Sequence, residues 1–379
     1  MTNPLTVLDR AVPVSPAALK LISRGIETLW TRLVEARPLA DSRPLLLSYD
    51  VHPTTDGPVL IEVNTNAGGI LTAMQAARHV NACCTDWEYD VLEERLLALF
   101  RRDLLGEDKQ TTGILAIVDD HLASQPLLAE MRELADLLRP HAQDVLVADA
   151  GDLDFRDGRL RYFDKPIDRV YWRSTDFLLS DPLHAAVRQA VLDGSTVLAP
   201  SPEAYQAIAD KRRFVEWSKQ PELARDDVTG LAFRLAETVP FGGKTVADWY
   251  AQRSQWVFKP VSGYASRGVY VGRSISRLKL ATLPADAPIW LSVTHPIRSW
   301  IAMARNGNTM FASSQIVARS LVPQLEYFMA KSSECAIPVA ALRQYEWARP
   351  AAWLVLLPQR RRRTKICGTY IRTIRDNVG

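Results

Sequence analysis

The sequence predicts an α/β protein built from more than one lobe. Its 379 residues are enough for two or three compact units, each with a core of its own. Between residues 112 and 200, apolar strand-like runs alternate with amphipathic helical patterns, which is typical of an α/β unit. With 47% hydrophobic and 23% charged residues, the composition is that of a globular chain and argues against disorder.

The first hundred residues predict a helix, a strand pair and two further helices. Apolar residues recur at helical spacing over residues 17–36 (Leu19, Ile22, Ile26, Leu29, Leu33). Two apolar runs, LLLSYDVH and VLIEVN, flank turn-forming residues 54–58 and so predict adjacent strands. Helical patterns follow over residues 71–80 and 89–105.

The middle of the chain predicts a separate lobe with a small parallel sheet. Strand patterns and helical patterns alternate here, so a doubly wound sheet with helices on both faces is expected over residues 112–203. A helix is then expected over residues 203–218, carrying Asp210 and Lys211. The strand QWVFKP enters a loop of small residues, 262–268, and VYVG leaves it as the next strand.

One group of candidate residues lies in LIEVNTNAGG, residues 60–69. Glu62 and Asn64 are two apart on a predicted strand and therefore project from the same face. Such oxygen ligands suit Mg²⁺, which binds through one or two protein oxygens and substrate phosphates. A charged residue at a strand end, followed by an Asn that opens a turn, gives the same short pattern, so both interpretations stay open.

A second group lies in FKPVSGYASRGVYVG, residues 258–272. Lys259 ends a strand, and the small residues after it allow backbone N–H groups to approach phosphates. Lys259 would place a positive charge on those phosphates, and Arg267 could add another. The Walker A pattern is absent from the sequence. The alternative is a hairpin with a long turn and a solvated lysine.

Taken together, these motifs resemble the ATP-grasp ligases in their circularly permuted form, as in eukaryotic-type glutathione synthetases. Here Glu62-x-Asn64 precedes Lys259 by almost two hundred residues, which is the permuted order. Ser48-Tyr49-Asp50 also resembles the S-x-D-like stretch of that family. The resemblance implies a circularly permuted ATP-grasp unit, from residues 1–111 and 204–288, with a Rossmann-like (pre-ATP-grasp) substrate lobe inserted at 112–203.

The same resemblance implies ATP and Mg²⁺ as cofactors and a role for each matching residue. The metal ligands would be Glu62 and Asn64, the substrate contacts Asp50 and Asn66, the catalytic residue Arg267, and the ATP-binding residues Lys211, Lys259, Ser262, Gly263, Ser266 and Gly268. The implied reaction is ligation of a carboxylate to an amine through an acyl phosphate. The expected partners are small-molecule or peptide carboxylates and amines.

Two departures from the glutathione synthetases disfavour glutathione itself. Ser48 stands where they carry an arginine, and the stretch Val261-Ser262-Gly263 replaces their loop glutamate. The acid and the amine therefore stay open.

Residues 289–379 differ in composition from the rest of the chain. Residues 1–288 hold 33 Lys and Arg against 39 Asp and Glu, a net charge of −6, whereas 289–379 hold 13 against 4, a net charge of +9. The acidic K-x-D-x-R strand of an ATP-grasp core is absent there. One hypothesis is a frameshift near Pro288, because reading one nucleotide earlier with suitable synonymous codons permits K-x-D-x-R. The alternative is a divergent but genuine lobe.

The state of this tail bears on whether the chain is an enzyme. Without the acidic ligand, weak or absent ligase activity is expected, and the alternative function is a non-catalytic nucleotide- or peptide-binding protein with a degenerate ATP-grasp fold. A nucleic-acid partner is disfavoured, because the basic tail carries no RNA-binding signature. We expect a cytoplasmic protein without a membrane partner, because no apolar run reaches transmembrane length. A homodimer stays open.

Overall fold

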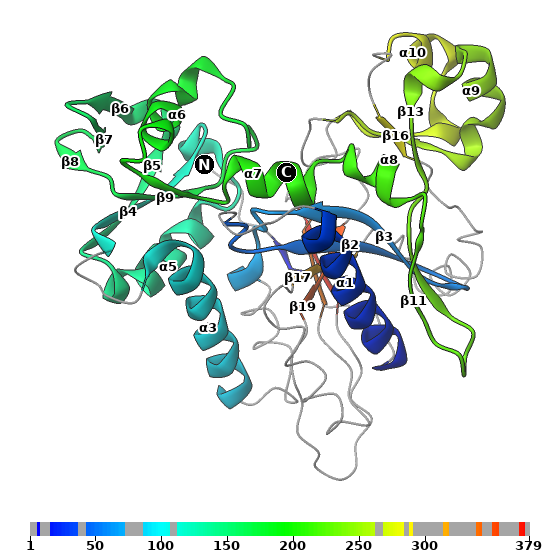
Figure 1. Cartoon of the computed structure of the whole chain (residues 1–379), viewed down its shortest axis with the longest axis horizontal. Helices are drawn as coiled ribbons and strands as arrows, with labels where there is room; N and C mark the ends of the chain where they lie inside the picture. The colour runs from blue at the N-terminus through cyan, green and yellow to red at the C-terminus, as the bar shows by residue number, and fades with distance from the viewer. Residues whose placement is uncertain are drawn as a thin grey trace.

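The computed structural model is a mixed α/β structure, which confirms the α/β class expected from the sequence. It describes residues 6–7, 16–36, 43–72, 86–106, 112–261, 268–283, 288–290, 314–317, 339–342, 351–355 and 371–375. The described strands form a nine-stranded mixed sheet, a four-stranded parallel sheet, a four-stranded antiparallel sheet and a small three-stranded sheet. Figure 1 shows the parallel sheet at the left, the nine-stranded sheet at the centre and the antiparallel sheet at the upper right.

The nine-stranded sheet joins strands from distant parts of the chain, in the order β1-β20-β18-β19-β17-β2-β3-β12-β11. Its strands are β1 (Thr6–Val7), β2 (Ser48–Thr54), β3 (Gly57–Asn64), β11 (Glu222–Arg225), β12 (Ala232–Leu235), β17 (Ser314–Val317), β18 (Val339–Leu342), β19 (Ala351–Val355) and β20 (Ile371–Arg375). Strands from residues 6–64, from residues 222–235 and from residues 314–375 therefore share one sheet.

Helix α1 (Pro16–Ala36) packs on this sheet, and its five predicted apolar positions are all buried. They share one core with Tyr49, Leu60, Val63 and Phe233. The predicted hairpin is confirmed as β2 and β3, which pair antiparallel. Gly57 opens β3 at φ +119°, and an added Cβ would lie 2.2 Å from the carbonyl oxygen of Ala232. Glycine is therefore needed where β12 approaches the turn.

Residues 112–203, here called the inserted lobe, contain the predicted parallel sheet. Its strand order is β10-β9-β4-β5, and every neighbouring pair is parallel. The strands are β4 (Ile114–Asp119), β5 (Asp144–Asp149), β9 (Arg169–Trp172) and β10 (Val197–Ala199). The chain leaves β4 toward β5 on one side and later returns to β9 on the other. The order therefore reverses between β4 and β9, where open α/β sheets bind ligands at the carboxyl ends of the strands.

Helices and a three-stranded sheet complete the inserted lobe. The helices include α5 (Leu128–Leu138), α6 (Ala185–Leu192), η2 (Leu122–Ser124), η3 (Arg139–His141), η4 (Ala150–Asp152) and η5 (Pro182–His184). The three strands are β6 (Leu153–Arg156), β7 (Arg159–Tyr162) and β8 (Lys165–Pro166). Before the lobe, the helical pattern expected over 89–105 is α3 (Asp86–Phe100) followed by the π-helix η1 (Arg101–Leu105). The helix expected over 71–80 is described only at residues 70–72.

The single helix expected over residues 203–218 is wrong. The structure has α7 (Pro202–Ala204), a π-helix η6 (Tyr205–Ala209) and a separate α8 (Arg213–Trp217). Asp210 leaves the helical region, with ψ at 120°, and its carboxylate accepts hydrogen bonds from the backbone and side chain of Arg212. A short polar side chain thus satisfies backbone donors at the break, as Asp commonly does. Lys211 lies in the turn between η6 and α8.

The antiparallel sheet has the order β13-β16-β14-β15 and lies beside two short helices, α9 (Val246–Gln252) and α10 (Arg277–Ala281) (Figure 1). Its strands are β13 (Thr238–Pro240), β14 (Val257–Phe258), β15 (Tyr270–Val271) and β16 (Pro288–Trp290), with η7 (Phe241–Gly243), η8 (Arg253–Gln255) and η9 (Gly272–Ser274) nearby. β16 pairs with both β13 and β14, so a strand crosses the expected segment boundary at 288.

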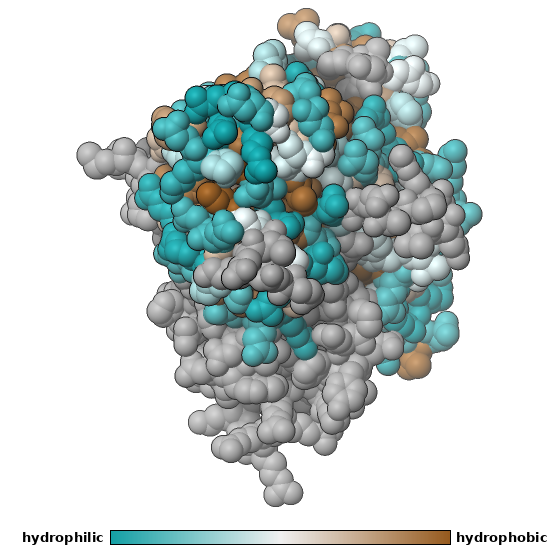
Figure 2. All heavy atoms as spheres, turned by 60° about the vertical axis from the view of Figure 1, so that its left-hand side comes forward, coloured by the Kyte–Doolittle hydropathy of each residue, from teal (hydrophilic) through white to brown (hydrophobic). Residues whose placement is uncertain are grey.

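Figure 2 shows one face of the molecule. The described residues on this face are largely hydrophilic, with hydrophobic residues scattered among them. Exposed large hydrophobic side chains include Phe163 and Leu192. In the part of the chain that the structure describes, no helix has the length and apolar character needed to cross a bilayer.

Candidate functional site

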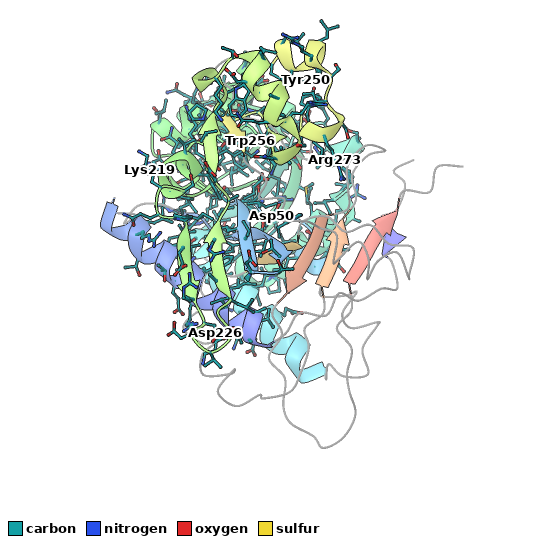
Figure 3. The ribbon with its side chains drawn as sticks, turned by 90° about the vertical axis from the view of Figure 1, so that its right-hand side faces the viewer. Asp50, Lys219, Asp226, Tyr250, Trp256 and Arg273 are labelled. Atoms are coloured by element: carbon teal, nitrogen blue, oxygen red, sulfur yellow. The ribbon has the colours of Figure 1, made fainter. Side chains whose placement is uncertain are left out.

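Four polar residues line one face of the β2–β3 ladder. Ser48 is paired with Asn64, and Asp50 with Glu62, whereas the pairs Tyr49–Val63 and Val51–Leu60 belong to the apolar core. Cross-strand partners share a face, so Ser48, Asp50, Glu62 and Asn64 lie opposite that core. Asp50 is in the inner part of the sheet, because β2 is bordered by β3 and β17 (Figure 3).

A β-bulge at Ile61 makes this arrangement possible. Strict alternation would place Leu60 and Glu62 on the same face, since they are two residues apart. The register shifts between the pairs Asp50–Glu62 and Val51–Leu60, which leaves Ile61 as the extra residue. Leu60 therefore enters the core while Glu62 turns to the polar face.

Two lysines from distant segments meet the carboxylate of Glu62. Lys211 Nζ lies 3.3 Å from Glu62 Oε1, and Lys259 Nζ donates to Glu62 Oε2 at 3.0 Å. The side chains of Glu62, Lys211 and Lys259 are 17%, 11% and 13% exposed. Three of the predicted ATP and metal residues therefore form one largely buried ion cluster.

The local structure explains how the lysines reach Glu62. The π-helix η6 packs against β3 and ends at Asp210, so the turn that follows places Lys211 beside the strand. Figure 1 shows α7 and α8 running above β2 and β3. Lys259 comes directly after β14. Single-turn π-helices are rare and are often found at functional sites.

The charges in this cluster keep Glu62 ionised. Burial alone would raise the pKa of Glu62, but Lys211 and Lys259 outweigh burial and lower that pKa to about 2. Asp50 is the direct cross-strand partner of Glu62, and two carboxylates in that position repel each other unless cations lie nearby. The two lysines supply positive charge directly at Glu62.

The donor set fits Mg²⁺ bound together with a phosphate ligand. An ionised Glu62 and the amide oxygen of Asn64 share a face, and hard oxygen ligands of this kind suit Mg²⁺. Among the described residues no group of three or more His, Cys, Asp and Glu side chains is arranged to hold a metal ion. A metal at Glu62 would therefore depend on phosphate oxygens for the rest of its coordination.

Asn66 and the glycines after it turn away from the carboxylates toward the inserted lobe. Asn66 Nδ2 donates to the carbonyl oxygen of Arg173 at 3.0 Å, and Arg173 Nη1 donates to the carbonyl oxygen of Asn66. Gly68 packs so tightly here that an added Cβ would lie 2.3 Å from Arg173 Nη2. The substrate role of Asn66 stays a prediction, while the structure uses its amide to join β3 to the inserted lobe.

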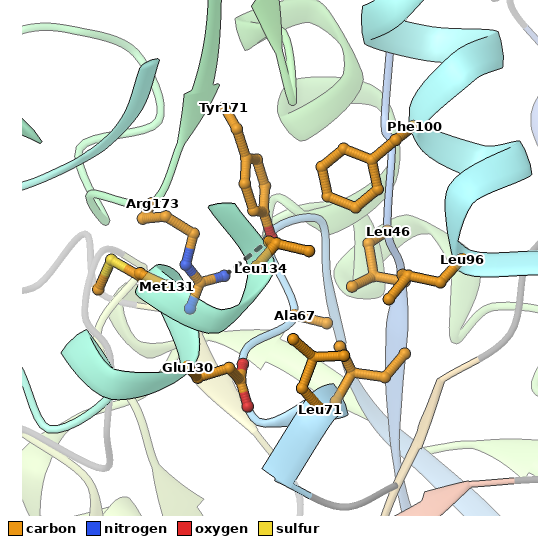
Figure 4. A pocket seen from close by; sticks show the side chains of 11 residues that line it. Leu46, Ala67, Leu71, Leu96, Phe100, Glu130, Met131, Leu134, Tyr171 and Arg173 are labelled. Atoms are coloured by element: carbon orange, nitrogen blue, oxygen red, sulfur yellow. Dashed lines mark hydrogen bonds between the residues drawn. The ribbon is translucent and has the colours of Figure 1, made fainter. Parts of the chain in front are cut away.

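Glu130 holds the same segment from α5. Its carboxylate accepts hydrogen bonds from Gly69 N at 2.6 Å and from Thr72 N at 3.1 Å. A cavity of about 10 Å³ lies beside Glu130 and Arg173, lined otherwise by mostly apolar side chains (Figure 4). This volume holds about one water molecule. The cavity is thus a packing gap between the lobes.

Sequence reasoning missed Arg173 and Glu130. Arg173 follows β9 at the carboxyl edge of the parallel sheet, next to the point where the strand order reverses. That position, combined with the predicted doubly wound sheet, was a usable signal for Arg173. Glu130 offered none, because its partners, two backbone N–H groups and the Thr72 hydroxyl, belong to a remote segment.

The rest of the predicted ATP loop is only partly described. Gly268 is exposed and has φ +74°, a conformation that favours glycine. Ser262, Gly263, Ser266 and Arg267 lie outside the described residues. Their roles stay predictions.

No protein-family model matches this sequence, and no curated protein sequence matches it. Among solved structures, the chain is similar to a candidate gamma-glutamylcysteine synthetase from Methylobacillus flagellatus KT. The two share 10% sequence identity at a TM-score of 0.45, over 76% of this chain and 78% of that chain.

Proposed function

We propose that the protein is an ATP- and Mg²⁺-dependent carboxylate–amine ligase with a circularly permuted ATP-grasp arrangement. The convergence of Lys211 and Lys259 on Glu62 is the observation that carries the proposal. Buried lysines facing an ionised carboxylate, on a strand that also presents an amide oxygen, form a set suited to phosphates and a hard cation. The candidate synthetase described above has a name consistent with this reaction class.

In this proposal some residues of the cluster would bind the metal and others would bind the phosphates. Glu62 and Asn64 would hold Mg²⁺, with Asp50 beside them, and Lys211 and Lys259 would hold phosphate oxygens. Bound Mg²⁺ would neutralise charge on the phosphates. With Glu62 on the cation, the ammonium groups of Lys211 and Lys259 would be able to turn from Glu62 to the phosphates. The predicted loop, with Ser262, Gly263, Ser266, Arg267 and Gly268, would cover them.

Phosphoryl transfer to a carboxylate depends mainly on positioning and on charge neutralisation. The lysines would supply positive charge for this step, and no nucleophilic side chain is required. The acyl phosphate formed on the substrate would then react with an amine. In this proposal the inserted lobe would bind the substrate at its carboxyl edge, where Arg173 and Asn66 meet near the strand-order reversal.

The test is ADP release with a panel of carboxylates and amines. A ligase releases ADP only when acid and amine are both present, and a Lys211→Ala/Lys259→Ala variant should lose this release. Lys219→Ala is the matched control, because Lys219 is exposed. ADP release that does not depend on the amine would instead indicate a phosphotransferase.

The second candidate is a non-catalytic nucleotide-binding protein. The four acids after residue 288 are isolated in sequence, without a K-x-D-x-R strand, and this observation favours it. Such a protein would bind ATP without turnover in the same assay. Resequencing the gene from the codon of Gly272 separates a frameshifted tail from a genuine one.

A further inference from the structure

A buried histidine in the inserted lobe lies between two carboxylates. His184, at the end of η5, has a side chain that is 2% exposed. Its Nδ1 is 2.8 Å from Asp176 Oδ2, and its Nε2 is 2.8 Å from Asp120 Oδ1. A neutral imidazole has one N–H and can donate to only one of them. Because the pKa values of Asp120 and Asp176 are lowered, both carboxylates are acceptors, and both contacts are hydrogen bonds only when the ring is an imidazolium.

The electrostatics favour that charged form. Burial would lower the pKa of His184, but the hydrogen bonds and charges of Asp120 and Asp176 outweigh it and raise the pKa above its usual value. The pKa of Asp176 is lowered to about 2, because its hydrogen bonds and His184 outweigh burial. Asp119 and His121 flank Asp120 on the same strand end. From α6, Arg188 donates to the carbonyl oxygen of Leu179.

The two carboxylates belong to different elements, so His184 ties them together. Asp120 follows β4, whereas Asp176 lies in the loop between β9 and η5, here called the 174–181 loop. Asp176 also accepts hydrogen bonds from Ser180 Oγ at 2.8 Å and Asp181 N at 2.7 Å, inside that loop. Ser174 Oγ closes the network by donating to Asp120 Oδ2 at 2.5 Å.

This loop reaches the candidate site through one aromatic stack. Phe177 lies parallel to Tyr205, with ring centroids 4.2 Å apart and an interplanar angle of 8°. Tyr205 begins η6, the π-helix that leads to Lys211. Burial raises the pKa of Tyr205 to about 12, with charges that include Asp210 and Glu62 adding to the effect. The stack therefore connects the loop to the segment that carries Lys211.

We propose that His184 is a positioning residue that holds the 174–181 loop, so that Phe177 packs on Tyr205 and keeps Lys211 beside Glu62. This inference rests on the proposed function, because its main measurement is nucleotide binding. A raised histidine pKa contributes stability that is fully present below the unfolded value of about 6.5 and is lost as pH rises through the folded value. Nucleotide affinity should therefore fall at alkaline pH through His184.

The first measurement is the protonation of the ring itself. Long-range ¹H–¹⁵N NMR spectra of the imidazoles, assigned with His184→Gln, should show both His184 nitrogens protonated at pH 6.5, and the ring should lose its proton at a higher pH than a free imidazole does. A His184 ring that is already neutral at pH 6.5 would overturn the inference. This measurement needs no nucleotide and does not depend on the proposed function.

The second measurement is titration with an ATP analogue that cannot be hydrolysed, with Mg²⁺, between pH 6.5 and 9.5. Wild type should lose affinity with rising pH. His184→Gln should bind about tenfold more weakly at pH 7, equivalent to about 1.4 kcal/mol, and show a flatter pH profile. His141→Gln is the control, since its ring meets Arg101 instead. Phe177→Ala should weaken binding while His184 still titrates as in wild type.

The outcomes separate the two proposals. Absence of nucleotide binding by wild type at every pH would overturn the proposed function and this inference together. Binding by wild type that His184→Gln and Phe177→Ala leave unchanged would overturn only the role of His184. If His184→Gln fails to fold, Phe177→Ala decides, because it removes the stack and leaves the histidine network intact.

Discussion

Replacing Glu62 by Gln should change how nucleotide binding depends on Mg²⁺. In the structure the carboxylate of Glu62 forms ion pairs with the ammonium groups of both Lys211 and Lys259. Nucleotide phosphates that arrive without a metal must break these ion pairs and leave a buried carboxylate beside them. The neutral amide of Glu62→Gln removes both costs and also removes a ligand for the metal.

The size of the effect follows from the pKa of Glu62. Its decrease from 4.5 to about 2 corresponds to about 3 kcal/mol, at about 1.4 kcal/mol per pKa unit. If the Glu62→Gln variant gains all of this free energy in metal-free ATP binding, its affinity should rise by about 100-fold. If it gains only part of it, the affinity should rise by about tenfold. The gain in affinity on adding Mg²⁺ should shrink by a similar factor.

The assay is isothermal titration calorimetry with an ATP analogue that cannot be hydrolysed, with and without Mg²⁺. Glu216→Gln is the control, because Glu216 forms an exposed ion pair with Arg213. Wild-type affinities in Glu62→Gln under both conditions would show that the nucleotide does not use this cluster, and the reasoning would fail.

Three further predictions test other parts of the structure. Gly68→Ala should destabilise the fold by about 1–3 kcal/mol in urea unfolding, since its Cβ would lie 2.3 Å from Arg173 Nη2 and 2.5 Å from Leu127 Cδ1. Gly243→Ala is the control and should be near neutral, because no atom lies within 4 Å of its Cβ. Burial raises the pKa of Asp119 from 3.8 to about 6, so the folded form of wild type gains stability as pH falls through that range. Asp119→Asn should therefore be more stable than wild type at pH 8, by up to about 3 kcal/mol, and the difference should vanish near pH 4; an unchanged thermal midpoint at pH 8 would contradict this. Because Glu62 has a lowered pKa, its contribution to stability should be complete above pH 4.5 and be lost as pH falls toward about 2; an acid unfolding curve of Glu62→Gln that matches wild type would argue against it.

Local patterns allowed much of the fold to be predicted from the sequence. The apolar spacing of α1, the turn residues between β2 and β3 and the β–α alternation of the inserted lobe each depend on neighbours in the chain. The same-face placement of Glu62 and Asn64 follows from strand geometry in the same way.

The features that were missed depend on tertiary contacts. The bulge at Ile61 decides which face Glu62 takes, and it exists only in the pairing with β2. The break at Asp210 depends on one carboxylate bonding to Arg212, in a stretch whose pattern otherwise favours a helix. Arg173 and Glu130 acquire their roles only when the inserted lobe packs on residues 66–72.

Affinity labelling tests most directly whether Lys211 and Lys259 hold a nucleotide. An acyl-phosphate derivative of ATP acylates lysines that lie beside its phosphates, and mass spectrometry identifies the modified residues. Labelling is expected at Lys211 or Lys259, and excess ATP with Mg²⁺ should prevent it, while exposed Lys219 reacts equally in both cases. Labelling confined to exposed lysines, with no protection by ATP, would show that Lys211 and Lys259 do not hold a nucleotide.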